Sequence, residues 1–317
     1  MRVLITDYDF PDVELETSLY EEAGIEVVVA QCRTEQDVIA AAEGCQGLLV
    51  QYAPINDRVF AARPEIRIVS RLGAGFDTVS TVDARKHGVW VANSPDYGVG
   101  EVASHALAMT LALVRHVVLY DRDVKAGNWH YSSSGRLNRV SDMTLGIVGL
   151  GRIGKRMAHI ARNSFARVIA FDPYLIDGDF PAYVERVDVA TLFRQADTVS
   201  LHVPLNGETT GLVNAALLDL MKPGSFLVNT ARGGVVNIDD VLTALDTGKL
   251  DGAALDVLPV EPPATSSRIV QHRRVLVSPH AAFYSVVAGA ELRRKAAQNL
   301  IDWARNGRPS YVVVEGS

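Results

Sequence analysis

The sequence has few cysteines and no long apolar run. Its 317 residues include only Cys32 and Cys45, which form neither a C-x-x-C pair nor a disulfide framework, so two buried thiols are expected. The longest apolar stretch, residues 106–114, is far shorter than the roughly 20 residues that a membrane-spanning helix needs. We therefore expect neither a disulfide scaffold nor a membrane protein.

Basic residues are in the minority, with 31 Lys and Arg against 37 Asp and Glu and a formal net charge of −6. No basic run occurs that could neutralise a phosphate backbone, so direct nucleic-acid binding is not expected. The eight histidines are scattered without H-E-x-x-H or paired spacing, so no metal is expected. Asp7 interrupts the opening where a signal peptide would need a longer apolar block, which indicates a cytoplasmic protein.

What the chain does contain is a regular alternation of short apolar runs and helical patterns. Its length and its 48% hydrophobic residues favour two domains with large cores. The alternation predicts βαβ units in two parallel sheets. The predicted strands are residues 3–6, 27–29, 47–50, 67–72 and 89–92, then 144–148, 167–171, 198–203, 226–230, 252–257 and 275–278.

Two helical patterns mark the domain organisation. One, at about residues 101–125, separates the two series of strands and follows the turn-rich residues 93–98, where we place the first boundary. The other, residues 288–306, is followed by a short strand at 312–314. A lone helix and strand cannot form a domain, so they are expected to pack on the first half of the chain.

The clearest local signal is a G-x-G-x-x-G pattern formed by Gly149, Gly151 and Gly154, directly after a predicted strand and before a predicted helix. In this setting the glycines permit a turn, a close approach to a pyrophosphate and tight helix–strand packing. The helix N-terminus adds free N–H groups and partial positive charge. A glycine turn without a ligand is the alternative, but this order of elements favours a dinucleotide site.

An acidic residue completes this pattern. Asp172 ends the next predicted strand, where its carboxylate could accept hydrogen bonds from the adenosine ribose and repel a 2′-phosphate. Neither Pro173 nor Tyr174 supplies the arginine that a phosphate would favour. The sequence therefore predicts NAD rather than NADP.

Three charged or titratable residues follow successive strands in the second half: Arg232, Glu261 and His280. The carboxyl ends of parallel strands share one edge of a sheet, so all three could line one cleft. Taken singly, they could be a surface cation, a solvated loop charge and a core histidine. Together, beside a dinucleotide loop, they supply a cation for a carboxylate, a proton donor and a tuning group, which hydride transfer to a 2-oxo acid needs.

Five segments carry a resemblance to the D-isomer-specific 2-hydroxyacid dehydrogenase family, and the likeness covers nearly the whole chain. They are residues 149–154, 227–234, 253–257, 261–262 and 278–282. Residues 171–174 and 279–285 look most like the branch that includes the C-terminal-binding protein corepressors. Phe283 departs from that branch, because the corepressors carry a tryptophan there.

The resemblance implies an α/β fold of two Rossmann-like parallel-sheet domains. An NAD-binding domain, residues 99–284, would be inserted into a flavodoxin-like substrate-binding domain made of residues 1–98 and 285–317. It also implies an NAD-dependent enzyme that interconverts a small 2-oxo acid and its D-2-hydroxy acid. In that enzyme His280 would be the acid/base, Glu261 would raise its pKa, and Arg232 would hold the substrate carboxylate.

Further residues are carried over from the family. Backbone N–H groups of Ala74 and Gly75 would bind the substrate carboxylate, and Tyr52 would face the substrate or be a core aromatic. His202 is expected to be structural. Glu101 and His105 are spaced so that they could form a catalytic dyad, but we expect them to be a helix-surface pair or a dimer contact. The helix at 101–125 resembles the dimerisation region, so we expect a homodimer. The implied cofactor contacts outside the glycines are Arg152, Ile153, Asp172, Pro204, Thr209, Thr230, Ala231, Asp256 and Ala282.

Two other functions are weighed against the dehydrogenase. An NAD(H)-responsive, corepressor-like interaction module would use the dinucleotide to stabilise a closed dimer, with little turnover. The complete Arg, Glu and His set, and a chain that ends at Ser317 without a disordered tail, favour the enzyme. A relative of the formate dehydrogenases would be expected to carry Gln beside the histidine, at the position where this chain has Glu261. The acid's side chain is not identified, although Tyr52, Trp129, Phe283 and Tyr284 suggest an apolar or medium-sized group.

Overall fold

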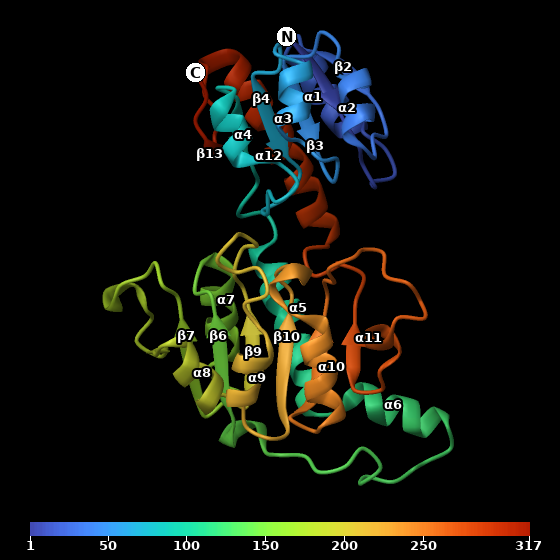
Figure 1. The fold of residues 1–317 in the computed structure, drawn as a ribbon, viewed down its shortest axis with the longest axis vertical. Coiled ribbons are helices and arrows are strands. Elements are labelled where there is room, and N and C mark those ends of the chain that lie inside the picture. Colours follow the sequence, from blue (N-terminus) through green and yellow to red (C-terminus); the bar gives the residue numbers. More distant parts are fainter. The chain divides into compact units, whose positions relative to one another are not determined.

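The computed structural model describes all 317 residues and divides the chain into two compact units. Unit 1 consists of Met1–Gly98 and Ser285–Ser317, and unit 2 of Val99–Tyr284 (Figure 1). Each unit contains one largely parallel sheet covered by helices on both faces. This arrangement confirms the predicted α/β fold class with two Rossmann-like sheets.

The sheet of unit 1 has the order β13-β5-β4-β3-β1-β2. All neighbours are parallel except β13, which pairs antiparallel with β5. Without β13 the order is the 2-1-3-4-5 arrangement of flavodoxin-like folds. The strands are β1 (Arg2–Ile5), β2 (Glu26–Val29), β3 (Gly47–Val50), β4 (Ile68–Arg71), β5 (Trp90–Ala92) and β13 (Val312–Val314).

Helices cover both faces of this sheet, and all four residues of the central strand β3 are buried, as expected for a sheet enclosed in this way. One face carries α2 (Glu35–Ala41), α3 (Asp57–Ala62) and α4 (Thr81–Lys86), and the other carries α1 (Glu14–Glu22) and α12 (Val286–Asn306). The buried Asn299 fixes α12, because its Nδ2 donates to Asn93 O at 2.9 Å and its Oδ1 accepts from Tyr311 N at 3.1 Å.

The sheet of unit 2 is parallel throughout, in the order β12-β11-β10-β9-β6-β7-β8. The direction of strand addition reverses between β6 and β9, which is the position where open α/β sheets bind ligands. The strands are β6 (Thr144–Val148), β7 (Arg167–Phe171), β8 (Glu185–Arg186), β9 (Thr198–Leu201), β10 (Ser225–Asn229), β11 (Leu250–Leu255) and β12 (Val275–Val277).

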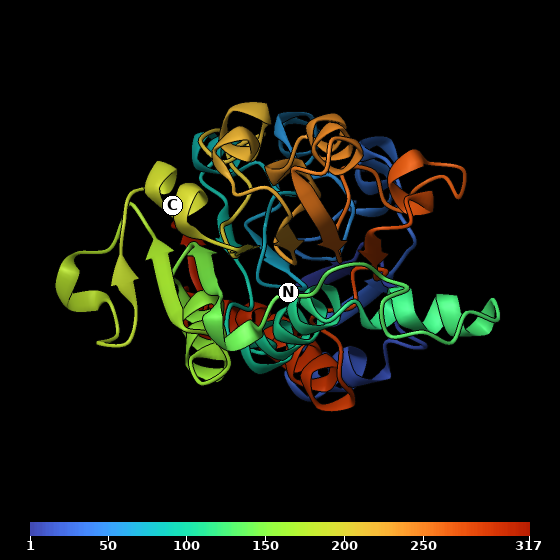
Figure 2. The same cartoon turned by 90° about the horizontal axis from the view of Figure 1, so that it is seen from below.

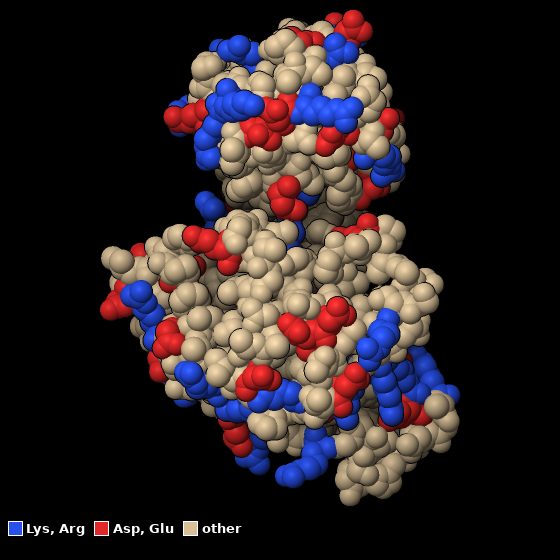
Figure 3. Space-filling model, viewed as in Figure 1, with Lys and Arg blue, Asp and Glu red and all other residues tan.

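Two helix layers enclose this second sheet, and the views in Figures 1 and 2 show them on opposite faces. The helices α5 (Val99–Val114) and α7 (Arg152–Ala161) pack on one face, and α8 (Val189–Gln195), α9 (Ala215–Leu220), α10 (Ile238–Asp246) and α11 (Arg268–Gln271) pack on the other. Three short 3₁₀ helices, η1 (Val140–Asp142), η2 (Asp177–Asp179) and η3 (Gly233–Val235), lie in the connections. Figure 3 shows acidic and basic side chains interspersed over the visible face of each unit.

The prediction of a helix at 101–125 is wrong in one respect. The structure divides this segment into α5 and α6 (Val117–Lys125), whose axes are bent by 58°. His116 adopts a left-handed φ of 51° at the break, and its buried ring lies 2.9 Å from the Asp251 carboxylate. That tertiary contact, rather than a local breaker residue, holds the bend. No single helix is long and apolar enough to cross a bilayer, and only this bent pair would pass by length and composition together.

Candidate active site

The predicted cofactor and catalytic residues of unit 2 lie in the loops that follow β6, β7, β9, β10, β11 and β12 or at the start of α7. These loops leave the carboxyl ends of parallel strands and therefore share one edge of the sheet. The residues are Gly149, Gly151, Arg152, Ile153, Gly154, Asp172, Pro204, Thr209, Thr230, Ala231, Arg232, Asp256, Glu261, His280 and Ala282.

The three glycines differ in what surrounds them. Gly149 has a φ of +91°, and a Cβ there would lie 2.8 Å from the His202 backbone. A Cβ on Gly154 would lie 2.1 Å from Gly149 O, whereas one on Gly151 would meet nothing within 4 Å. Packing therefore requires the first and third glycines, while the backbone at Gly151 faces open space.

The helix that follows this loop leaves its first N–H groups available. Gly151 is the N-cap of α7 and makes no side-chain capping bond, so the first turn lacks the partner that a serine or aspartate would provide. Such a terminus binds anions through its N–H groups and its dipole. Open space at Gly151 and an uncapped helix together fit a pyrophosphate.

Asp172 is fixed beside the glycine loop. One carboxylate oxygen accepts from Leu150 N at 2.8 Å and the other from Tyr174 N at 3.0 Å. Each oxygen keeps further acceptor capacity, so the group can also bind ribose hydroxyls. Directly after β10, the Thr230 hydroxyl is buried and has no hydrogen-bond partner, so it is a candidate contact for a polar ligand.

The loop after β9 is a closed turn. The Thr209 hydroxyl accepts from Asn206 N at 2.9 Å and donates to Pro204 O at 2.6 Å, so it holds this turn. His202, just before the turn, contacts the Ser200 hydroxyl at 2.9 Å, and burial lowers its pKa to about 4. A neutral, hydrogen-bonded histidine of this kind suits a structural role.

Glu261 and His280 lie in direct contact. His280 Nδ1 is 2.7 Å from Glu261 Oε2, and Glu261 Oε1 accepts from Leu258 N at 2.8 Å. An ionised carboxylate can only accept, so Nδ1 carries the hydrogen and Nε2 is the ring atom left for exchange with a ligand. Both side chains are about one-third exposed, at 30% and 35%, and are thus accessible to a small molecule.

Arg232 belongs to the same electrostatic group. Burial opposes ionisation of Glu261, but hydrogen bonds from His280 and Leu258 N, with the positive charge of His280 and Arg232, outweigh it and lower the pKa of Glu261. The backbone explains this proximity, because a Cβ on Gly233 would lie 1.9 Å from the Leu258 carbonyl carbon. The glycine after Arg232 thus lets the β10 and β11 loops pack closely.

Asp256 holds the loop that carries His280. Its buried carboxylate accepts from Ser278 Oγ at 2.5 Å, Ala281 N at 2.9 Å and Ala282 N at 3.0 Å. The backbone between these residues turns through His280, whose φ is 52°. The loop therefore has a rigid internal support that the sequence pattern did not reveal.

His105 also contacts the loop that follows β12, and its expected role as a helix-surface pair or dimer contact stays a prediction. Its Nε2 lies 3.1 Å from Ser278 Oγ and 3.6 Å from the Asp256 carboxylate. Because the Ser278 hydroxyl donates to Asp256, its oxygen accepts from His105. The residues are 173 positions apart, so no local spacing could have indicated this contact.

The candidate substrate residues of unit 1 have their own local geometry. Tyr52 is 44% exposed and is not a core aromatic, and its hydroxyl donates to Asp9 at 3.0 Å. The carbonyl of Ala74 accepts from Asn93 Nδ2 at 2.6 Å, whereas the N–H groups of Ala74 and Gly75 make no hydrogen bond. Two free N–H groups in one loop can receive a carboxylate.

Comparison with known proteins agrees with these features. Residues 107–282 match the NAD binding domain of the D-isomer specific 2-hydroxyacid dehydrogenases. The glyoxylate reductase of Korarchaeum cryptofilum is 34% identical over 282 residues, covering 87% of this chain and 85% of the relative. The D-3-phosphoglycerate dehydrogenase of Synechocystis sp. is 33% identical over 269 residues, covering 84% of this chain and 46% of the relative. The chain thus spans about half the length of the second relative.

A solved structure extends the likeness to both units. The D-lactate dehydrogenase of Aquifex aeolicus, complexed with NAD and lactic acid, has a TM-score of 0.85 and 25% identity, covering 99% of this chain and 100% of that chain. The family match alone covers more than half of the sequence, and it confirms both the family and the NAD cofactor predicted from the residues. Placement in the corepressor-like branch stays a prediction. On these grounds the chain belongs to the D-isomer specific 2-hydroxyacid dehydrogenase family.

Proposed function

We propose that the protein is an NAD-dependent oxidoreductase that interconverts a small 2-oxo acid and its D-2-hydroxy acid. The observation that carries this proposal is the 2.7 Å contact between His280 and Glu261, next to Arg232 and on the sheet edge that holds the glycine loop. In this proposal residues 99–284 are the NAD-binding domain, and residues 1–98 with 285–317 are the substrate-binding domain.

Residues of unit 2 would hold the cofactor along its length. The first turn of α7, with Gly151, Arg152 and Ile153, would bind the pyrophosphate, and Asp172 the adenosine ribose. The nicotinamide half would contact the free hydroxyl of Thr230 and residues in the loops after β10, β11 and β12, namely Ala231, Asp256 and Ala282. When bound, NAD(H) supplies or accepts the hydride at C2 of the acid.

Arg232 would bind the substrate carboxylate. Its guanidinium is a planar fork of N–H donors that matches the geometry of a carboxylate, and the bond from Nη1 to Ala231 O at 2.8 Å orients the side chain. The free N–H groups of Ala74 and Gly75, and the exposed Tyr52, are the substrate-binding groups that we propose for unit 1. Fixing the carboxylate fixes the orientation of C2, which is a large part of the expected rate enhancement.

His280 would donate a proton from Nε2 to the substrate oxygen during reduction and recover it during oxidation. Glu261 stabilises the protonated ring through its bond to Nδ1 and holds the ring orientation. The lowered pKa of Glu261 keeps this carboxylate ionised well into acidic solution. Donor and stabiliser therefore act as a pair.

The decisive experiment is NADH oxidation with glyoxylate, pyruvate, hydroxypyruvate, phenylpyruvate and methylthio-oxobutyrate. We expect turnover of at least one acid, with loss of NADH absorbance and formation of the D-hydroxy acid. Tight NADH binding without turnover of any of them would contradict the enzyme and favour an NAD(H)-responsive interaction module.

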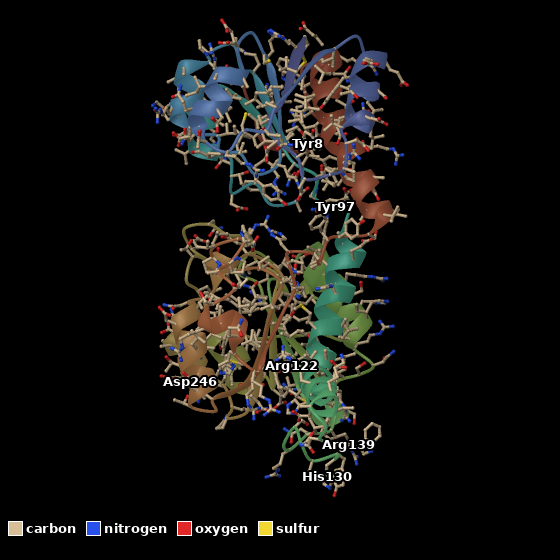
Figure 4. All side chains as sticks on the ribbon, turned by 90° about the vertical axis from the view of Figure 1, so that its right-hand side faces the viewer. Tyr8, Tyr97, Arg122, His130, Arg139 and Asp246 are labelled. Atoms are coloured by element: carbon tan, nitrogen blue, oxygen red, sulfur yellow. The ribbon has the colours of Figure 1, made fainter.

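We also propose a homodimer in the cytoplasm. The arm formed by α6 and the segment after it carries exposed apolar side chains, including Val117 at 54% and Trp129 and Tyr131 at 85% each. Figure 2 shows this arm projecting from the body of unit 2, and Figure 4 labels His130 and Arg139 in the segment that follows α6. Large exposed aromatics suit a protein contact. A monomeric mass in solution at micromolar concentration would contradict the dimer.

A further inference from the structure

Two loops that flank the glycine loop are joined by a single side-chain bond. Tyr174 follows β7, and its hydroxyl donates to the Glu208 carboxylate, in the loop after β9, at 2.5 Å. In the sheet, β7 and β9 lie on either side of β6, the strand that leads into the glycine loop. The bond therefore connects the two neighbours of the strand at which the dinucleotide is expected.

Both ends of this bond are anchored by their own backbones. Tyr174 N donates to Asp172 Oδ1 at 3.0 Å, which ties the tyrosine to the residue proposed for the adenosine ribose. Glu208 N donates to Asn206 Oδ1 at 2.9 Å, within the turn that Thr209 closes. The side chain of Tyr174 is 74% exposed, so these anchors, rather than core packing, fix the position of the pair.

The two charged groups that act on the Tyr174 hydroxyl, Glu208 and Asp172, are both negative. Its pKa is raised by the hydrogen bond to Glu208, by the negative charge of Glu208, by partial desolvation and, least of all, by the charge of Asp172. The phenol therefore stays protonated at neutral pH and keeps donating to the carboxylate. Asp172 and Glu208 thus lie close enough to Tyr174 to act on the same group.

We propose that Glu208, held by Tyr174, is a second specificity-determining carboxylate that acts with Asp172 to reject a cofactor bearing a 2′-phosphate. This inference rests on the proposed NAD-binding function of unit 2. A 2′-phosphate carries nearly two negative charges at neutral pH, so a fixed carboxylate within a Debye length, about 10 Å at 0.1 M salt, repels it more than it repels a ribose hydroxyl. Tyr174 acts through Glu208 by keeping that charge in place.

The test is direct binding, followed by the fluorescence of NADH and of NADPH on mixing with the purified full chain. We expect Glu208→Gln to reduce the preference for NADH over NADPH, expressed as the ratio of their Kd values, by about threefold to tenfold at low salt. The change should shrink as salt is added. Asp219→Asn, an exposed acid on α9, removes the same charge away from the loop pair and should leave the ratio unchanged.

Tyr174→Phe removes only the hydroxyl. It should shift the ratio in the same direction by less, and it should add nothing in a Glu208→Gln background, because its effect passes through that carboxylate. An unchanged ratio in Glu208→Gln, an equal change in Asp219→Asn, or an independent effect of Tyr174→Phe would overturn the inference. Absence of NADH binding by the unmodified protein would overturn the proposed function and the inference together, which distinguishes the two failures.

Discussion

Ser278 donates a 2.5 Å hydrogen bond to the carboxylate of Asp256, which is only 2% exposed. The same carboxylate holds the backbone of Ala281 and Ala282, so this bond braces the turn that presents His280. The support is a property of the loop itself and does not depend on a ligand. Ser278 is therefore a residue outside the reacting groups at which this support can be tested.

Ser278→Ala should lower kcat about tenfold or more while leaving NADH binding within a few-fold, because a hydrogen bond to a buried charge contributes about 1.5–3 kcal/mol. Ser104→Ala, which removes an exposed hydroxyl on α5, is the matched control. Adding His105→Ala to Ser278→Ala should cost little more, since the hydrogen bond that His105 makes to this loop is to that hydroxyl, and the Asp256 carboxylate lies farther away at 3.6 Å. Additive losses in steady-state kinetics would contradict this order of contacts.

His280→Ala should reduce the rate of 2-oxo acid reduction by about 10² to 10⁴, the usual contribution of a positioned acid. NADH binding, followed by fluorescence, should persist, because the imidazole is not among the groups proposed for the phosphates or ribose. His159→Ala removes an exposed histidine of α7 and should retain full activity. Comparable activity in the two variants would remove His280 from the acid role.

Glu261→Gln should retain more activity than His280→Ala, since it keeps a side chain of the same shape beside the ring. A neutral amide stabilises a protonated imidazole less than the carboxylate does, so the protonated form is lost at lower pH. The pH profile of reduction should therefore move to lower pH. A profile identical to that of the unmodified enzyme would exclude the proposed partnership.

Gly151→Ala should fold normally but lose NADH affinity, because its Cβ meets no protein atom within 4 Å yet enters the space left for the pyrophosphate. Gly154→Ala should instead lower the melting temperature, since its Cβ would lie 2.1 Å from Gly149 O. Gly178→Ala, also in open space but far along the chain, serves as the control. Binding titrations and thermal unfolding separate the two effects.

Burial of His202 predicts a pH dependence of stability. Its pKa is about 4 in the fold, against 6.5 for a histidine exposed to water, so below pH 6.5 the unfolded chain binds a proton that the native protein does not. Stability should therefore fall as pH drops from 6.5 toward 4, by about 2 kcal/mol near pH 5 from this residue alone. Denaturant unfolding of His202→Gln at pH 7 and pH 5 should show a correspondingly smaller loss.

Local pattern predicted much of the fold. The bounds of β3, β6, β7 and β13 agree with the predicted runs, because each is a short apolar segment bordered by turn or charged residues. The two-residue β8 and the break at His116 were missed. The first is too short to leave a pattern, and the second depends on Asp251, which is 135 positions away.

Some features of the candidate site could likewise be predicted from local sequence, and others could not. The glycine loop and Asp172 could be recognised because strand, turn, helix and acid follow one another in the chain. The contact between Glu261 and His280 could only be inferred from strand ends sharing an edge. The bracing of the loop by Ser278, and the close packing at Gly233, were not predictable, because they join segments with no common local signature.

Unit 1 is assembled from both ends of the described sequence, with β13 added as an antiparallel edge to β5. On the ribosome, the continuous unit 2 can acquire its structure while the residues that complete unit 1 are still unsynthesised, and domains generally fold as units during translation. The five N-terminal strands must therefore wait, with the surface that α12 will cover exposed to solvent and chaperones. Premature termination before Ser285 should release a chain with one folded domain and one incomplete, aggregation-prone domain.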